Sequence, residues 1–559
     1  MSIVTRARTS APTVPERRER GTPPRPGPGR SGTTPQVRRR RLTLASGLVA
    51  VLIAVVAVLV FSGSGPVPPA TGAARVVPAD VLGYVHLSID PGRPAVRDAE
   101  ALAKKFPDGP LAYAAAISRL TAIVGGGGSV DFATGIRPWL GKEAAFALLD
   151  TPGASAPSLI VLDVSNLARA RRFVSGAGAT PVAVYDGVRI LGYGSGTELA
   201  FVSHYLVVGP DAAVRGAIAA GTGRARSLAA DPAYQRAAAG EPAGRVLDVY
   251  LPAAGLRRVL EPRGGVIGAI ARLLDRPALV GTTLSVSAIS GGADVQIHRT
   301  VRPGGSHPIS FAPTLQSVLP AGSTLMLDVD GLDRAGPQLL GAFATAGVAA
   351  NVAPLLSRLG TSLTGQGVSV DKVLSSIFGG ETAVALSPDP TPSLLIVSRT
   401  SHQTATQSEL AGLEAPVTAL FPAPAAGPGQ IPGLADQQVG GVTVHELGLG
   451  AGLQIDYAVF NGLVVVSTSV RAIDEVASRS RSLADDNAYK TVLAEQPGQV
   501  SSVLFADFSQ LLNLGEQTGL TSGTRMRALL PDLAKVRAIG LSSTGGKSDT
   551  TTELHVEIP

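Results

Sequence analysis

The chain has 559 residues, a net charge of +6 and no cysteine. The absence of cysteine excludes disulfides, thiol catalysis and thiolate metal sites. Residues 1–41 contain eleven Arg and two Glu, a net charge of +9, so the remaining residues carry 6 − 9 = −3. Because the basic charge is confined to the tail, the sequence argues against a nucleic-acid partner.

The stretch from Leu42 to Phe61 holds twenty residues without a charge, after a tail rich in Pro, Gly, Ser, Thr and Arg. A helix of that length spans roughly 30 Å, the thickness of the hydrocarbon core of a bilayer. Arg38 to Arg41 precede it directly, and the next basic residue is Arg75. The positive-inside rule therefore predicts a single-pass anchor with residues 1–41 cytoplasmic and the bulk of the chain extracytoplasmic.

A cleaved signal peptide is the alternative interpretation of this apolar run. Signal peptides normally have an apolar core of about 7–15 residues behind a short basic region. The run here is longer and its basic region extends over 41 residues. We therefore expect a disordered tail at 1–41, an uncleaved transmembrane helix at 42–61 and a short linker at 62–74.

From Arg75 onward the sequence repeats itself. The segment 225–235 reads ARSLAADPAYQ, and the segment 480–490 reads SRSLADDNAYK. Four of its residues recur 255 positions later: Arg226, Leu228, Asp231 and Tyr234 return as Arg481, Leu483, Asp486 and Tyr489. This pattern predicts two tandem homologous repeats at 75–303 and 318–559, joined by a linker at 304–317. We expect helix capping or a local ion pair to account for the shared Arg and Asp.

Within each repeat, runs in which apolar and polar residues alternate are followed by amphipathic segments. Leu82–Ile89 is typical of a strand, and 95–106 of a helix, whereas 256–274 predicts a longer helix pair. Asp186-Gly187, Gly440-Gly441 and Asn461-Gly462 predict two-residue hairpin turns, while Ser203-His204 is a poorer turn at the place equivalent to Asn461-Gly462. Adjacent hairpins combined with helices predict an α+β fold with antiparallel sheets.

Four short motifs carry a resemblance to a known family: Val77–Asp80 (VPAD), Pro138–Gly141 (PWLG), Tyr185–Gly187 (YDG) and Leu206–Gly209 (LVVG). With these motifs the chain resembles the membrane-anchored actinobacterial proteins grouped as domain of unknown function 3352. The resemblance covers most of 75–559, once per repeat, and implies a single anchor and an extracytoplasmic repeat. It implies no reaction, ligand or functional residue. The second repeat has 376–379 (SIFG) in place of the PWLG motif, so Trp139 is not required by both halves.

The seven histidines of the chain offer no metal-binding spacing. No two of them lie three or four residues apart, and His445-Glu446 begins the HExxH motif but lacks its second His. His298 and His555 hold similar places near the ends of the repeats, in alternating strands, where we expect solvent-facing or edge positions. We therefore predict no metal ligand and no cofactor.

Asp328, Asp330 and Asp333 form a DxDxxD pattern that could suggest calcium. The Gly and Glu that an EF-hand loop needs further on are absent. Asp328 aligns with His86, and we expect it to lie on a solvated strand face. The Gly-rich segments 192–196 and 448–452 lead into strands, so they indicate hairpin geometry and not a phosphate loop.

No catalytic, cofactor-binding or metal residue emerges from these patterns. We expect a non-enzymatic binding or scaffolding module of the cell envelope, whose partner is an envelope protein or a lipid. The alternative is an extracytoplasmic hydrolase whose site is assembled from residues dispersed along the chain, because catalytic partners need not be close in sequence.

Overall fold

The computed structural model describes residues 67–128, 130–151, 156–194, 196–263, 272, 275, 278–303, 309–333, 375, 377–387, 392–419, 433–450, 453–479, 481–519, 521 and 523–559. The tail, the apolar run at 42–61 and part of the helix pair expected over 256–274 lie outside these residues. Among the helices within them, none has the length and hydrophobicity needed to cross a membrane.

The first half of the described chain contains ten strands with helices between them. They are η1 (Gly72–Arg75), β1 (Val81–Ser88), α2 (Pro94–Ala103), α3 (Gly109–Val124), η2 (Phe132–Ile136), β2 (Leu140–Leu149), β3 (Ser158–Val164), α4 (Leu167–Gly176), β4 (Thr180–Tyr185), β5 (Val188–Gly192), β6 (Glu198–Val202), β7 (Tyr205–Gly209), α5 (Asp211–Gly221), η3 (Leu228–Ala230), α6 (Pro232–Ala238), β8 (Leu247–Pro252), α7 (Ala253–Gly255), η4 (Leu256–Leu260), η5 (Glu261–Arg263), β9 (Leu279–Ile289) and β10 (Gly292–Val301).

The second half also contributes ten strands. Its elements are η6 (Leu315–Ser317), β11 (Leu325–Asp330), β12 (Glu381–Ser387), β13 (Ser393–Arg399), α12 (Gln403–Ala419), β14 (Gly433–Val439), β15 (Val442–Gly450), β16 (Leu453–Phe460), β17 (Leu463–Ser467), α13 (Val470–Ser478), η7 (Leu483–Asp485), α14 (Asn487–Val492), β18 (Ser502–Asp507), α15 (Phe508–Gln517), α16 (Thr524–Leu533), β19 (Ala538–Gly545) and β20 (Asp549–Glu557).

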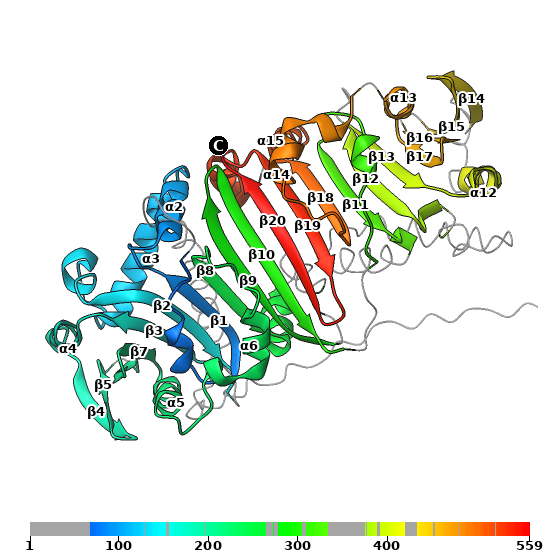
Figure 1. Ribbon diagram of the computed structural model, residues 1–559. Coiled ribbons are helices and arrows are strands. Elements are labelled where there is room, and N and C mark those ends of the chain that lie inside the picture. The colour runs from blue at the N-terminus through cyan, green and yellow to red at the C-terminus, as the bar shows by residue number, and fades with distance from the viewer. Residues whose placement is uncertain are drawn as a thin grey trace, which may run out of the picture. The chain divides into compact units, whose positions relative to one another are not determined.

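The described strands form one antiparallel sheet, so the predicted α+β class is confirmed (Figure 1). The strand pairs of the first half give the order β4-β5-β6-β7-β3-β2-β1-β8-β9-β10. Those of the second half give β14-β15-β16-β17-β13-β12-β11-β18-β19-β20, the same order with each number raised by ten. The two series meet where β10 pairs with β20.

The hydrophobic cores stay within the halves. Each of the core clusters found among the described residues draws its side chains from one half, the largest of the second half running from Phe311 to Ala538. The cores cover both faces of β1, which is buried at seven of its eight positions. Tyr84 packs in one cluster and Val85 in another. The strand predicted over Leu82–Ile89 is present as β1, and it is buried along nearly its whole length because this central strand is covered on both faces.

The predicted two-residue turns are confirmed by their backbone angles. Asn461 and Gly462 have φ of 50° and 71°, and Asp186 and Gly187 have 49° and 76°. Positive φ at both central positions defines the type I′ turn, whose twist suits a hairpin. At the equivalent turn of the first half, Ser203 has φ of 53°, and His204 is not among the residues with positive φ. That turn therefore needs the left-handed conformation at one position only.

Residues from the two segments expected as linkers take part in the cores. Ala73 and Leu315 are fully buried, at equivalent places in η1 and η6. A buried carboxylate holds the first turn of each: the backbone N–H of Ala73 donates to Glu143, and that of Leu315 donates to Glu381. Each half thus begins with a short helical turn that is anchored to its second strand.

Candidate functional site

A row of directly paired residues crosses the middle of the sheet on one face. In spatial order from β2 to β12 it contains Ala145, His86, Asp248, Ser285, Gln296, Glu553, Ser542, Val503, Asp328 and Ala383. Residues that face each other across antiparallel strands point to the same side of the sheet. The row is pseudo-symmetric about the Gln296–Glu553 pair, and its charged members are the candidate site of this fold.

His86 is the centre of the row in the first half. Its ring is buried between two carboxylates, with Nδ1 2.9 Å from Asp248 Oδ2 and Nε2 3.2 Å from Glu143 Oε2. Burial alone would lower the pKa of His86, but the hydrogen bonds to Asp248 and Glu143 outweigh it and raise the pKa to about 9. His86 is therefore a cation at neutral pH that joins strands β2, β1 and β8.

Further polar groups complete this cluster. Arg245 lies with Nε 2.6 Å from Asp248 Oδ1 and with Nη2 2.9 Å from Glu241 Oε2. The hydroxyl of Tyr205 donates to Glu143 Oε1 over 2.7 Å. Burial, reinforced by the charge of Asp248, raises the pKa of Glu241 to about 8. His86 and Arg245 each lie against two carboxylates of this cluster, so its buried charges are paired.

The second half has a glutamate at the position of Glu143 but an aspartate at the position of His86. Glu381 stands where the first half has Glu143, and it accepts from the backbone N–H of Leu315 at 2.9 Å and from Arg399 Nε at 2.9 Å. Asp328 stands in the place of His86 and is fully buried. Burial, with the nearby charge of Glu381, raises the pKa of Asp328 to about 8. The solvated strand face expected for Asp328 is therefore wrong, because the core of the second half covers it.

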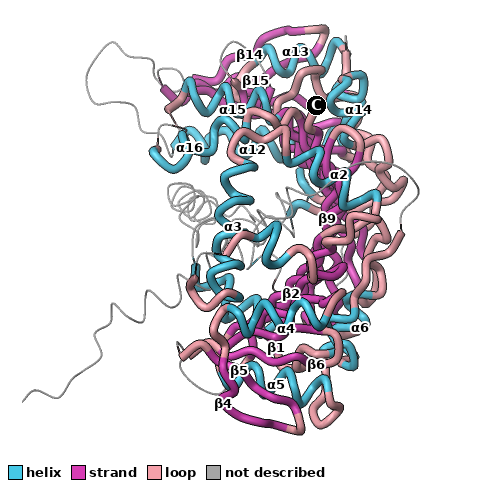
Figure 2. Tube along the Cα trace, turned by 90° about the vertical axis from the view of Figure 1, so that its left-hand side faces the viewer, coloured by secondary structure: helices cyan, strands magenta, loops and turns pink. Residues whose placement is uncertain are grey.

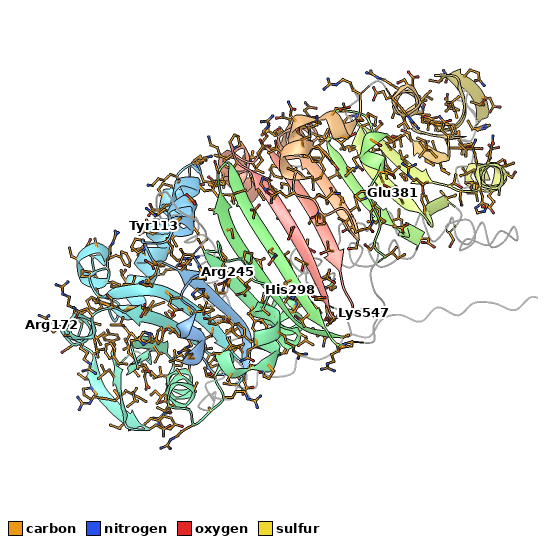
Figure 3. The ribbon with its side chains drawn as sticks, viewed as in Figure 1. Tyr113, Arg172, Arg245, His298, Glu381 and Lys547 are labelled. Carbon is orange, nitrogen blue, oxygen red and sulfur yellow. The ribbon has the colours of Figure 1, made fainter. Side chains whose placement is uncertain are left out.

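His298 and His555 lie in the joint between the halves and not at an edge of the sheet. The Nδ1 atom of His298 is 3.1 Å from Thr551 Oγ1, and that of His555 is 2.8 Å from Asp294 Oδ1. Strands β10 and β20 each have a paired strand on both sides, which excludes the edge position, one of the two positions expected for these histidines; both side chains are partly buried. Figure 3 shows His298 on the strands between the two halves.

The repeated Asp residues cap helices, as one of the two sequence-based explanations predicted. Asp231 accepts hydrogen bonds from the N–H groups of Ala233 and Tyr234, and Asp486 accepts one from Ala488. The repeated Arg residues contribute backbone carbonyls, since Arg226 O accepts from Ala79 and Arg481 O accepts from Ala321. These bonds attach the start of each half to the turn before α6 or α14, which is a structural role.

A cavity of about 560 Å³ opens beside Tyr250 in the first half, and its polar lining includes Asp80, Asp150, Asp231 and Arg258. Arg258 pairs with Asp150, and Asp231 is used as a helix cap. The second half has Gly322 at the place of Asp80 and Phe505 at the place of Tyr250. The fold therefore does not require the polar lining of this cavity.

The chemistry available to the buried cluster follows from its hydrogen bonds. A general base needs a free lone pair within reach of the proton that it removes. Both ring nitrogens of His86 face carboxylates, and the hydrogen bonds to these carboxylates raise the pKa of His86, which favours the imidazolium form. Across the described ranges, no group of three His, Asp or Glu side chains is arranged to hold a metal ion. The cluster can cross-link strands by charge.

Sequence patterns did not reveal this cluster. His86 and Asp248 are 162 residues apart, and each sits in an otherwise apolar strand. The available signal was a charged or titratable residue inside the apolar runs YVHLS and RVLDV. If the neighbouring residues are buried, this residue is buried too, and a buried polar side chain needs a hydrogen-bond partner.

Fold and buried row together define a tandem α+β protein built on one continuous antiparallel sheet. The chain belongs to the family described as "Protein of unknown function (DUF3352)", whose match extends over residues 42–558. The resemblance noted in the sequence is thereby confirmed. No curated protein matches the chain.

Among solved structures, the chain is similar to crystal forms I and III of TP0453. Both matches have 12% sequence identity and a TM-score of 0.24. Form I covers 42% of this chain and 81% of its own, and form III covers 42% and 82%. At this level of similarity the comparison carries no argument about function.

Proposed function

We propose that this chain is a single-pass membrane-anchored protein of the cell envelope, whose two homologous halves form one extracytoplasmic scaffold for a partner. The observation that carries the scaffold is the buried cluster around His86. His86 pairs with Asp248 and Glu143, and Glu143 also accepts from the backbone N–H of Ala73, so the cluster joins strands β1, β2 and β8 and holds the first turn of its half. These contacts make a rigid platform.

The anchor is supported by the run Leu42–Phe61 behind Arg38–Arg41. The family match begins at Leu42, so the apolar run is included in the matched region. Arg93, which is 3% exposed, donates from Nε and Nη2 to the carbonyl of Val67 at 2.9 and 2.7 Å. The residue six positions after Phe61 is thus attached to the folded part, as a scaffold close to its membrane would require.

A topology experiment on the full chain in cells tests this proposal. The chain has no cysteine, so Ser10→Cys in the tail and Val184→Cys in β4 each introduce a single thiol. Val184 is 68% exposed. A membrane-impermeant maleimide added to intact cells is expected to label Val184→Cys and to label Ser10→Cys only after lysis. The reverse pattern, or labelling of neither position before lysis, would overturn the proposed orientation.

The non-catalytic role needs a separate measurement. We expect the purified full chain to turn over no ester, peptide or glycan substrate, and to be recovered crosslinked to an envelope component. Turnover that disappears when a single polar side chain, such as Asp150 of the cavity, is changed to its amide would establish the hydrolase instead.

A further inference from the structure

Two helices from different halves of the chain expose large apolar side chains. Leu111 of α3 is 70% exposed, and Leu529 and Met526 of α16 are 52% and 38% exposed. We call these three residues the α3–α16 patch. Large apolar side chains exposed on neighbouring helices mark a contact surface more often than scattered single ones do.

A hydrogen bond holds the two helices together at this place. The backbone N–H of Asp108, directly before α3, donates to Asp532 Oδ1 at 3.0 Å. Leu111 follows Asp108 by three residues, and Leu529 precedes Asp532 by three, so each leucine lies one turn from the contact on the same helix face. Met526 lies one further turn back along α16. Figure 2 shows α3 and α16 on the same side of β9.

Basic side chains accompany the patch. Arg527 stands within α16 between the two apolar residues, and Lys535 follows two residues after the helix; both side chains are exposed. The other basic side chains nearby are engaged within the chain: Lys104 pairs with Glu100, Lys105 donates to the carbonyl of Ile558, and Arg537 pairs with Glu557. Apolar side chains flanked by Lys and Arg are the composition of helices that lie in a membrane interface, where each basic residue near anionic headgroups contributes about 1 kcal/mol.

The tether limits how far the patch can be from the bilayer. Val67 is six positions after Phe61 in the sequence, a reach of at most about 20 Å. Arg93 fixes Val67 at the start of α2, and the ten residues of α2 span about 15 Å toward α3. A bilayer that holds the anchor is therefore within reach of the patch.

We propose that the α3–α16 patch lies on the extracytoplasmic surface of the bilayer that holds the anchor, with Leu111, Met526 and Leu529 among the headgroups and the basic residues against anionic lipid. This inference rests on the membrane anchoring proposed above. Docking would fix the orientation of the scaffold relative to the membrane, so that the joint between its halves is presented in one direction.

Depth measurements on the full chain in vesicles test the proposal. Single cysteines at Leu111 and Leu529 carry the environment-sensitive dye NBD, and Val184→Cys, of matched exposure, is the control. The vesicles contain either phosphatidylcholine alone or phosphatidylcholine with phosphatidylglycerol, each with and without doxyl-labelled lipid. We expect blue-shifted emission and at least twofold quenching by doxyl lipid at 111 and 529 in anionic vesicles, weaker quenching at high salt, and none at 184.

The outcomes separate this inference from the proposed function. Chain that floats with the vesicles while all three dyes report water would overturn the docking and leave the anchor in place. A blue shift without doxyl quenching would mean that protein, either a second copy or another part of the chain, covers the patch, and would also overturn it. Failure of the full chain to float would contradict the anchor itself.

Discussion

Gln296 of β10 lies directly opposite Glu553 of β20, and the bonds on either side of this pair are arranged symmetrically around it. Two positions in one direction His298 faces Thr551, and two positions in the other His555 faces Asp294. The two halves of the chain therefore meet as the subunits of a two-fold dimer would, but with different residues at equivalent places.

Self-pairing of β20 would oppose Glu553 to Glu553 and Asp549 to Glu557, whereas pairing with β10 separates these acids. We expect this repulsion to favour the observed joint, since like charges placed directly opposite destabilise a sheet.

A cysteine pair across the joint tests its geometry. In Gln296→Cys/Glu553→Cys, we expect a disulfide within one chain, because opposed residues of antiparallel strands have Cα atoms about 4.5–5.5 Å apart. The measurement is the faster migration of the oxidised chain in a non-reducing gel. Gln296→Cys/Ser542→Cys, two strands apart at roughly 10 Å, is the control and should stay reduced. Covalent dimers in the first variant would instead mean that halves are exchanged between chains.

Removal of the His86 cation should be costly. His86→Asn leaves Glu143 and Asp248 facing each other without their shared positive charge, and we expect a loss of about 3–5 kcal/mol in unfolding free energy. Chemical denaturation at pH 6.5 measures it. His204→Asn is the matched control, since the His204 side chain is 63% exposed, and it should cost under about 0.5 kcal/mol. Equal losses in the two variants would contradict the charge-balancing role.

The same histidine gives stability a dependence on pH. Folding raises the pKa of His86 from its ordinary 6.5 to about 9, so its stabilising contribution is complete below pH 6.5 and is lost as the pH rises toward 9. We expect the denaturant concentration at the unfolding midpoint of the parent chain to decrease as the pH is raised from 6.5 to 9. The decrease should be smaller in His86→Asn. A midpoint whose pH profile is unchanged by the substitution would show that His86 does not hold the extra proton.

Replacement of Asp328 should stabilise the chain, whereas replacement of His86 should destabilise it. Its pKa is raised from 3.8 to about 8, so the folded state binds this proton more tightly than the unfolded state, and stability falls as the pH rises from about 4 to 8. Asp328→Asn is isosteric with the protonated acid and removes the cost, so we expect it to stabilise the chain at pH 7 by about 1–3 kcal/mol. Thermal melting at pH 5 and pH 7.5 measures the gain, which should be larger at pH 7.5.

Asp330→Asn is the comparison for that change, because Asp330 is on the same strand face but partly exposed. It should shift the melting temperature little at either pH. Destabilisation by Asp328→Asn at pH 7.5 would mean that the carboxylate is charged and held by a partner.

The hairpin at Asn461-Gly462 should depend on its glycine. Gly462→Val forces a β-branched residue to φ near 71°, and we expect a cost of about 1–2 kcal/mol. His204→Val, at the equivalent second position of the first half, should cost less, because the positive φ there belongs to Ser203. Urea unfolding of the two variants measures these costs. Equal losses of unfolding free energy would contradict the different turn geometries.

The sequence by itself determined the local structure and the family. Alternation placed strands, Asn461-Gly462 and Asp186-Gly187 placed turns, and the repeated Asp231 and Asp486 marked caps, because each depends on residues within a few positions of one another. Only the tertiary structure decided that β10 pairs with β20 and that His86 lies between Glu143 and Asp248. These contacts join residues far apart in the chain, and their register follows from how the whole sheet buries its apolar faces, which no local pattern encodes.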